Sequence, residues 1–216
     1  MNRMIAAGLV TLATVVAGMA AERKPDAEGF VTLFDGTSLE GWKKAAENPD
    51  SFRLEDGAIV AHGPRCHLFY VGDPQPFKNF HFVCEVMTRP NSNGGIYFHT
   101  KYQETNWPAQ GHECQVNNSY QRDPQKTGSI YKVAPVLQPP AKDNEWFKYE
   151  ILVQGNHVVV KINDQVVADY TEDPEKLAGQ KGIEPTRRIG EGTFALQAHD
   201  PGSTVYYRNI RVKRLP

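Results

Sequence analysis

The chain has 216 residues, a length that suits one domain or two small ones. Its 24 Lys and Arg residues balance 25 Asp and Glu residues, and a formal net charge of -1 argues against a nucleic-acid-binding protein, which usually carries a basic excess. Hydrophobic residues make up 40% and charged residues 23% of the chain, as in ordinary globular proteins.

The first twenty residues have the three parts of a secretory signal peptide. Arg3 supplies a positive start, an apolar stretch follows, and Gly18 and Ala20 are the small residues expected before a cleavage site. An uncleaved membrane anchor is the alternative, because the stretch is close to the roughly 17 residues that cross a bilayer. We expect a signal peptide at 1–20, a linker at 21–29 and one domain at 30–216. Cleavage would leave a periplasmic or secreted protein that is not integral to the membrane.

Three cysteines, Cys66, Cys84 and Cys114, cannot all pair within one chain. Export to an oxidising compartment would permit one disulfide. The alternative is three buried thiols that behave as small hydrophobic side chains, and we favour it. The spacing contains no CxxC metal motif.

After the linker, short runs of β-branched and aromatic residues predict strands. They lie at 30–34, 52–62, 80–87, 94–100, 112–118, 145–154, 157–162, 165–171, 192–199 and 205–213, and helical periodicity is weak and confined to 174–181. Gly155-Asn156 and Asn163-Asp164 are typical of hairpin turns. Many short strands with regular turns indicate an all-β sandwich or barrel. Two loops, 101–111 with Trp107 and 134–144, are of the kind that frames binding clefts.

Alternation within three of these strands gathers polar side chains on one face. These are Tyr97 and His99 in the first strand, Glu113, Gln115 and Asn117 in the second, and Gln197 and His199 in the third. A water-facing sheet surface would explain the pattern. His, Glu, Gln and Tyr are also able to bind sugar hydroxyls or exchange protons, so a functional cleft is the second explanation. We expect the other histidines, His62, His67, His81 and His157, to be structural or solvent-facing.

The expected cleft has one clear carboxylate, Glu113. Glycosidases with retaining or inverting mechanisms need two, and the next residues on the same face, Gln115 and Asn117, are amides. Asp35 and Asp200 lie in turn-like contexts where Asp commonly bends the backbone. The sequence also lacks the GxSxG, HExxH, P-loop and GxGxxG motifs of triad hydrolases, zincins and nucleotide-binding proteins.

Six segments resemble the 3-keto-disaccharide hydrolase domain family of exported bacterial proteins. They are LFDGTSLEGW (33–42), NSNGGIYFHT (91–100), ECQVNN (113–118), TGSIY (127–131), EWFKYEILVQGNHVVVKIND (145–164) and GTFALQAHDPGSTVYYRNIRVKRL (192–215). The resemblance implies a concanavalin A-like jelly-roll of two antiparallel sheets with little helix and a site on its concave face. This chain departs from the family at Cys114, where an apolar residue is common, and at His99, where Arg is common. A fixed positive charge at His99 is therefore not expected.

The chemistry that the resemblance implies needs only one base. A ketone at C3 acidifies the C2 proton, whose removal lets the C1 substituent leave by β-elimination, and water then adds. We expect Glu113 or His199 to act as the base, and Tyr131 to donate a proton to the leaving oxygen. Substrate-binding residues would be His99, Tyr97, Gln115, Gln197, Arg208 and Trp107, some of them stabilising the enediolate. An oxidoreductase would have to supply the 3-keto sugar.

Two further questions stay open at this point. A divalent metal held by His99, Glu113 and His199 would polarise the ketone, with an unmetallated hydrogen-bond network as the alternative. Jelly-rolls also serve as non-catalytic glycan-binding modules, for which Trp107, Tyr97 and Tyr102 would supply the aromatic surface. A structural or interaction domain is a third hypothesis, but no strand shows an unusual apolar exposed face.

Overall fold

The computed structural model describes residues 23–178 and 185–216. The expected signal peptide at 1–20 lies outside the described residues. In the part of the chain that is described, no helix is long and apolar enough to span a bilayer.

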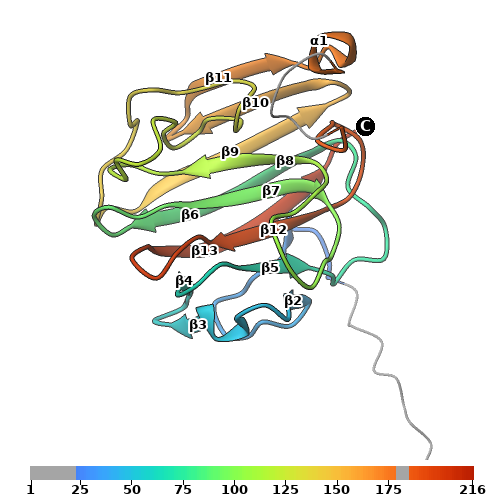
Figure 1. Ribbon diagram of the computed structural model, residues 1–216. Helices are drawn as coiled ribbons and strands as arrows, with labels where there is room; N and C mark the ends of the chain where they lie inside the picture. The colour runs from blue at the N-terminus through green and yellow to red at the C-terminus, as the bar shows by residue number, and fades with distance from the viewer. Residues whose placement is uncertain (1–22, 179–184) are drawn as a thin grey trace, which may run out of the picture.

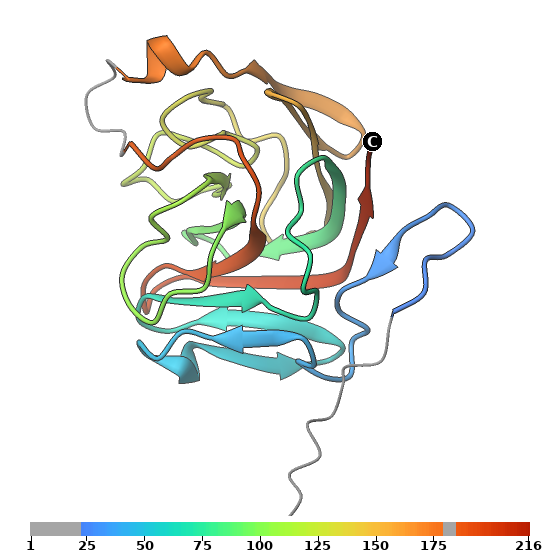
Figure 2. The same cartoon turned by 90° about the vertical axis from the view of Figure 1, so that its right-hand side faces the viewer.

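The described residues form a sandwich of two antiparallel sheets (Figures 1 and 2). The larger sheet has eight strands: β1 (Val31–Thr32), β3 (Phe52–Glu55), β4 (Ala58–His62), β6 (Phe80–Thr88), β9 (Phe147–Gln154), β10 (His157–Ile162), β11 (Gln165–Thr171) and β13 (Thr204–Arg214). The smaller sheet has five: β2 (Trp42–Lys44), β5 (Cys66–Tyr70), β7 (Gly94–Thr100), β8 (His112–Val116) and β12 (Thr193–Ala198). A 3-10 turn, η1 (Pro49–Ser51), and one short helix, α1 (Pro174–Ala178), complete the described elements. The prediction of an all-β sandwich with little helix is confirmed.

Strand order explains how distant segments meet. The larger sheet runs β11-β10-β9-β6-β13-β4-β3, with β1 beside β13, and the smaller runs β2-β5-β12-β7-β8. The meander β9-β10-β11 lies at one edge of the larger sheet, as its hairpin turns predict. In the smaller sheet, β12 from the end of the chain lies between β5 and β7. This placement brings β7, β8 and β12, the strands with the polar faces, next to one another.

Tight turns with left-handed residues set the hairpin registers. Asn163 and Asp164 have φ of 50° and 66°, and Ile162 pairs with Gln165 across them. Two central residues with positive φ define a type I′ turn, whose twist matches that of the strands. Asp56 and Gly57 repeat this arrangement between β3 and β4.

The core lies between the two sheets and is rich in aromatic rings. Phe194 of β12 packs against Phe80 and Phe82 of β6, with ring centroids 4.9 and 4.8 Å apart. All three rings are fully buried, and each contributes about 1.5–3 kcal/mol through removal of apolar surface from water. The alternate residues of the smaller sheet therefore point away from this core.

Two strands escaped the sequence analysis, β2 and β5. Every residue of β5 (CHLFY) is buried, because β2 and β12 flank it and side chains cover both of its faces. A short strand buried on both faces shows no alternation of polar and apolar residues, and this alternation is the signal on which the prediction depends. The omission matters because β5 carries His67 beside the polar face.

The three cysteines are buried and unpaired, as predicted. Burial raises the pKa of the Cys66 thiol to about 11, and it also raises the pKa of Cys84 and Cys114. Thiolate is the reactive form of cysteine, so all three side chains should be inert in the folded protein.

We expect the native protein to leave a thiol reagent such as DTNB unreacted at pH 8, and all three cysteines to react once guanidinium unfolds the chain. The absorbance of the thiolate that DTNB releases measures the number of reactive cysteines in the native and in the unfolded protein. A thiol that reacts rapidly in the native state, or fewer than three in the unfolded state under non-reducing conditions, would contradict this arrangement.

Candidate active site

A cavity of about 530 Å³ lies against the face of the smaller sheet that is turned away from the core. Its floor comes from β7, β8 and β12. Its walls come from three loops, with lining residues at 106–109, 123–132 and 186–187, and the loops lie on the same side of the sandwich (Figure 2). The lining residues are Asn93, Tyr97, Asn106, Trp107, Pro108, Ala109, Glu113, Gln115, Asp123, Tyr131, Lys132, Thr186, Arg187, Gln197 and His199. The expected loop at 101–111, here called the Trp107 loop, is one wall, whereas no residue of 134–144 lines the cavity.

Glu113 lies on the cavity floor, where three neighbouring strands hold its carboxylate. Tyr97 pairs with Glu113 across β7 and β8, and its hydroxyl donates a hydrogen bond of 2.7 Å to Oε2. Gln197 on β12 donates from Nε2 to Oε1, also at 2.7 Å. Gln197 is two strands away from Glu113, so the carboxylate has to cross β7 to reach it.

Gly95 makes this crossing possible. It is the β7 residue that pairs with Gln197 on one side and Gln115 on the other. A Cβ at this position would meet Glu113 Oε1 and lie 3.0 Å from Glu113 Cγ, so any larger residue would displace the side chain. The glycine that the sequence shows in the GGIYFHT segment thus leaves space for a carboxylate rather than forming a turn.

Burial dominates the ionisation of Glu113. The residue is 6% exposed, and desolvation raises the pKa of its carboxyl above the ordinary value of 4.5. The hydrogen bond from Tyr97 and the positive charge of Arg187 oppose this effect without cancelling it. A carboxylate whose pKa is raised toward the working pH is a better proton acceptor than an exposed one.

His199 follows directly after β12 and is held on several sides. Its Nδ1 lies 2.7 Å from Oδ2 of Asp200, which also accepts a hydrogen bond from Ser203 Oγ. Because an ionised carboxylate only accepts hydrogen bonds, Nδ1 carries the proton, and Nε2 is the nitrogen available for proton exchange. The rings of Trp107 and Tyr120 pack on the imidazole at centroid distances of 5.3 and 5.7 Å. Asp200 bends the backbone as predicted, accepting from Gly202 N, but it also orients His199.

Arg187 supplies a positive charge in the cavity wall. Its guanidinium lies 5.8 Å from the Tyr97 ring centroid and donates to Pro108 O at 3.3 Å, so it links its own loop to the Trp107 loop. Its charge lowers the pKa values of Glu113, Tyr97 and Tyr131 relative to burial alone. A cation at this place is suited to stabilise negative charge that develops on a bound ligand.

A second carboxylate, Asp123, lines the cavity beside Tyr131. Burial and the Asp123 charge raise the pKa of the Tyr131 phenol, which therefore stays protonated. Gln115 donates to Asn93 Oδ1 at 3.0 Å and approaches Asp123 Oδ2 at 3.5 Å. This wall presents hydroxyl, amide and carboxylate groups of the kind that bind sugar hydroxyls.

Two buried polar atoms next to Glu113 have no hydrogen-bond partner among the described residues. They are Gln197 Oε1 and His67 Nε2. His67 pairs with Gln197 in the sheet and packs edge-on against Tyr97 and Trp107, and burial lowers its pKa to about 3. An unsatisfied buried group costs about 1–3 kcal/mol, so a ligand hydroxyl or water that bonds Gln197 Oε1 would be stabilised here.

The prediction that His99 contributes to the cleft is wrong. Its Nε2 bonds Lys78 O at 2.9 Å, its Nδ1 accepts from Gly190 N at 3.1 Å, and its ring packs against Phe80. The φ of His99 is 54°, so the strand departs from the two-residue alternation at this residue. Gly111 and Gly192 lie next to this irregular point of β7, and a Cβ on either would collide with backbone atoms of residues 98–100. Burial lowers the pKa of His99 to about 4, which keeps it neutral.

The prediction that Arg208 binds substrate is also wrong. Arg208 lies on β13, in the larger sheet, and its Nε donates to Glu85 Oε2 at 2.6 Å while its guanidinium covers the Trp146 ring at 4.0 Å. The sequence YYRNIRV did not show which face of its strand carries Arg208. The reason is a shift in the pairing of β13 with β6 between Arg208 and Arg211, which breaks the alternation of faces. Arg187 occupies the cavity instead.

The metal ligand set proposed from the sequence does not assemble. His99 points away from Glu113 and His199, and within 23–178 and 185–216 no three His, Cys, Asp or Glu side chains converge on a point that could hold a metal ion.

The remaining predicted residues do line one cavity. They are Glu113, His199, Tyr131, Tyr97, Gln115, Gln197 and Trp107. Sequence analysis missed Arg187, Asp123, Asn93 and Thr186 because they lie in irregular loops, where no periodicity shows the direction of a side chain. The cluster of Arg187 and Arg188 after a proline was the one available signal. His67, expected to be structural or solvent-facing, is buried and packs against two cavity residues, Tyr97 and Trp107.

A family model described as "3-keto-alpha-glucoside-1,2-lyase-like domain" matches residues 29–213. A curated protein named 3-keto-disaccharide hydrolase, from Bacteroides thetaiotaomicron, is 28% identical over 88% of this chain and 80% of its own length.

Solved structures share the fold. A Parabacteroides distasonis protein, whose description proposes a glycosyl hydrolase, superposes with a TM-score of 0.73 at 24% identity over 88% of this chain and 95% of its own. A carbohydrate-binding module from Bacillus subtilis has a TM-score of 0.55 at 10% identity over 80% of this chain and 95% of its own. At these identities the likeness shows the jelly-roll fold alone, and that fold serves both enzymes and binding modules.

We expect Glu113→Gln to stabilise the protein at neutral pH. The pKa of Glu113 is raised because the folded state disfavours the ionised carboxyl. The contribution of this carboxyl to the stability of the fold is therefore fully present below the unfolded-state pKa, and it is lost as pH rises through the folded-state pKa. Glutamine carries no charge and keeps both contacts, since its oxygen accepts from Gln197 and its amide donates to Tyr97. Each unit of pKa shift corresponds to about 1.4 kcal/mol, or about 3–6 °C in Tm for a domain of this size.

Thermal unfolding of both proteins at pH 7.5 and near pH 4 measures this difference. The advantage of the variant should be largest at pH 7.5 and shrink in acid. A variant that is less stable at both pH values by the same amount would show that Glu113 is not held as a strained, buried charge.

Proposed function

Because the chain belongs to the 3-keto-alpha-glucoside-1,2-lyase-like family, we propose that it cleaves 3-keto-glycosides, including 3-keto-disaccharides, by removing the C2 proton and eliminating the C1 substituent. The family and the curated relative named 3-keto-disaccharide hydrolase support the more general conclusion that the chain is a glycoside-cleaving enzyme. The mechanism rests on one observation, the single carboxylate on the cavity floor. Glu113 is buried, the pKa of its carboxyl is raised, and the neutral side chains of Tyr97 and Gln197 donate hydrogen bonds to it.

Glu113 is the proposed base. Its carboxylate takes the C2 proton, and the C–H electrons form a C2=C3 double bond while the ketone oxygen gains negative charge. The Arg187 guanidinium, which lines the same cavity, stabilises this enediolate. Tyr97 and Gln197 fix the direction of the carboxylate.

The second step expels the C1 substituent. The enediolate re-forms the C3 ketone, a C1=C2 double bond forms, and the C1–O bond breaks with its electron pair on the leaving oxygen. His199 in its imidazolium form, oriented by Asp200 through Nδ1, donates a proton from Nε2 to that oxygen. Tyr131, kept protonated by its raised pKa, is the alternative donor. Water then adds across C1=C2, so the net reaction is hydrolysis.

The source of the substrate and the location of the reaction are part of the same proposal. A 3-keto sugar forms by oxidation of a hydroxyl, so an oxidoreductase acting on the glycoside supplies the substrate. We propose from the signal-peptide pattern of the first twenty residues that the protein is exported and acts in the periplasm or outside the cell. The N-terminal sequence of the protein purified from its host tests this.

We expect purified protein to release the C1 leaving group from a 3-keto-glucoside and from 3-keto-trehalose, and Glu113→Gln to lower kcat/KM about 10²–10⁴-fold. Mass spectrometry measures substrate and leaving group. Glu150→Gln is the matched control, because Glu150 is also a buried carboxylate but lies on β9 in the larger sheet, paired with His81 and Lys148. Parallel reactions with EDTA test whether a cation takes part.

Saturable binding of unoxidised glycans without turnover of any 3-keto sugar would contradict the enzymatic proposal and support a glycan-binding module. Loss of activity in Glu150→Gln as large as in Glu113→Gln would show that the effect is structural.

The pH dependence supplies a separate test. Glu113 must be ionised to act, so kcat/KM should fall as pH drops through its raised pKa. Arg187 lowers that pKa by its charge, and Arg187→Gln should therefore move the acid limb of the profile to higher pH besides lowering the rate. An acid limb that stays in place would assign it to another group.

A further inference from the structure

We infer that Glu47 and Arg65 are positioning residues of the active site: they hold the Trp107 loop and, through the Trp107 ring, the His199 imidazole. Neither residue is among those that line the cavity. The kinetic part of this inference rests on the proposed function, whereas the positional part does not.

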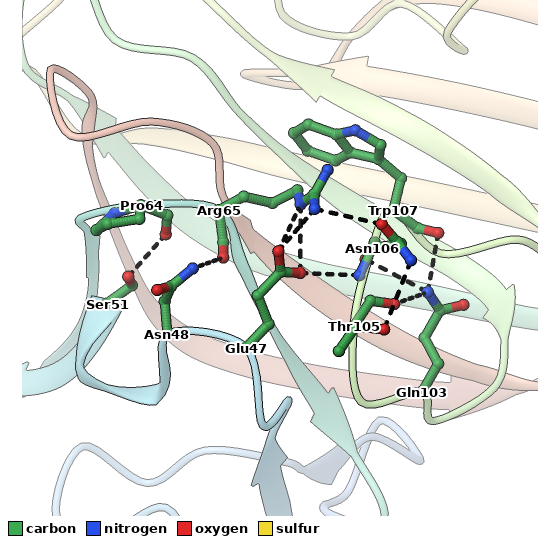
Figure 3. Close-up of polar contacts among 9 residues, drawn as sticks. All are labelled: Glu47, Asn48, Ser51, Pro64, Arg65, Gln103, Thr105, Asn106 and Trp107. Carbon is green, nitrogen blue, oxygen red and sulfur yellow. Dashed lines mark hydrogen bonds and ion pairs between the residues drawn. The ribbon is translucent and has the colours of Figure 1, made fainter.

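The Trp107 loop is closed on itself by one side chain. Gln103 donates from Nε2 to Thr105 O at 2.7 Å and to Trp107 O at 2.9 Å (Figure 3). Its Oε1 accepts from Ala109 N at 3.0 Å. These bonds fix the internal shape of the loop. They do not fix where the loop lies relative to the sheet, which needs contacts to other elements.

An ion pair outside the loop provides those contacts. Arg65 Nη2 lies 2.6 Å from Glu47 Oε1, and Glu47 Oε2 accepts from the backbone N–H of Asn106 at 2.8 Å. Arg65 Nη2 also approaches Asn106 Oδ1 at 3.3 Å (Figure 3). In addition, Glu47 N donates to Glu104 O at 2.9 Å. The hydrogen bond from Arg65 is the largest of the effects that lower the pKa of Glu47. The two side chains are 31% and 21% exposed, so water screens the pair less than a fully exposed one.

The backbone that carries Arg65 is itself anchored. Asn48 Nδ2 donates to Arg65 O at 2.9 Å, and Ser51 Oγ donates to Pro64 O at 2.7 Å (Figure 3). These bonds tie the start of β5 to the η1 turn. The guanidinium therefore projects from a fixed point of the sandwich toward the loop.

Trp107 connects Arg65 to the cavity residue His199 through contacts of its ring. The Arg65 guanidinium lies 5.0 Å from the Trp107 ring centroid, within the range of a cation–π contact. The same ring packs on His199 at 5.3 Å and on His67 at 5.6 Å. An indole in contact with all three side chains fixes the imidazole on a side that Asp200 does not cover. A displacement of about 1 Å at a catalytic group lowers a rate by about 10²-fold.

The matched control is another Arg–Glu pair. Arg53 and Glu55 on β3 form an ion pair of 2.8 Å with side chains 45% and 42% exposed, in the larger sheet. Arg53→Gln removes a guanidinium–carboxylate contact without touching the loop. The variants to compare with it are Arg65→Gln, Glu47→Gln and the conservative Arg65→Lys, which keeps the charge but not the two-pronged geometry.

The first measurement uses no substrate. The Cε1–H signal of His199, identified by its loss in His199→Asn, should shift in Arg65→Gln toward its position in Trp107→Ala, because the ring current of the indole leaves the imidazole. Arg65→Lys should shift it less and Arg53→Gln not at all. If Arg65→Gln does not fold by circular dichroism, Arg65→Lys and Glu47→Gln decide. A His199 signal that responds to Trp107→Ala but to none of these variants overturns the inference.

The second measurement is kinetic. With His199 in the proton-transfer step, Arg65→Gln should lower kcat about ten- to hundredfold with little change in KM, and Arg65→Lys should recover part of the rate. A rise in KM with unchanged kcat would overturn the inference, since the loop would then only cover the substrate. If wild-type protein turns over no 3-keto sugar, the proposed function fails and the His199 signal alone decides the positional inference.

Discussion

The burial of one negative charge between three strands is the constraint on which this site depends. Glu113 lies where a β-sandwich would normally place an exposed polar residue, but loops on that face leave it only 6% exposed. Its two oxygens are satisfied from β7 and β12, which requires the bare backbone of Gly95 between them. The arrangement costs stability in the folded state and yields a carboxylate suited to accept a proton. This exchange of stability for reactivity is common at functional sites.

The loops around the cavity follow from that constraint. All seven residues of β7 and all five of β8 are buried, although only one face of each strand meets the core. The Trp107 loop, the segment with Asp123 and Tyr131, and the segment with Arg187 cover the other face. The segment with Arg187 is bonded to the Trp107 loop, as from Arg187 to Pro108 O. The Trp107 loop is in turn held to the sheet edge through Glu47 and Arg65. Preformed walls of this kind reduce the ordering that binding or catalysis would otherwise require.

Much of the fold and part of the site could be predicted from the sequence. Alternation in β7, β8 and β12 placed Tyr97, Glu113, Gln115 and Gln197 on one face, and hairpin turns fixed the β9-β10-β11 meander. The errors have local causes. Positive φ at His99 broke the alternation, a register shift at Arg208 concealed its side, and burial on both faces concealed β5. Arg187 and Asp123 could not be found, because a loop residue reaches a site through tertiary contacts that no sequence period records.

The fate of the hydrogen at C2 tests the central claim most directly. A 3-keto-glucoside that carries deuterium at C2 is cleaved to completion, and the sugar product is weighed by mass spectrometry against an incubation without enzyme. Elimination through an enediolate predicts a slower reaction than with the unlabelled substrate and a product that has lost its C2 deuterium to solvent. Direct displacement at C1, as in two-carboxylate glycosidases, leaves that bond intact. A product that keeps its deuterium would contradict Glu113 as the base.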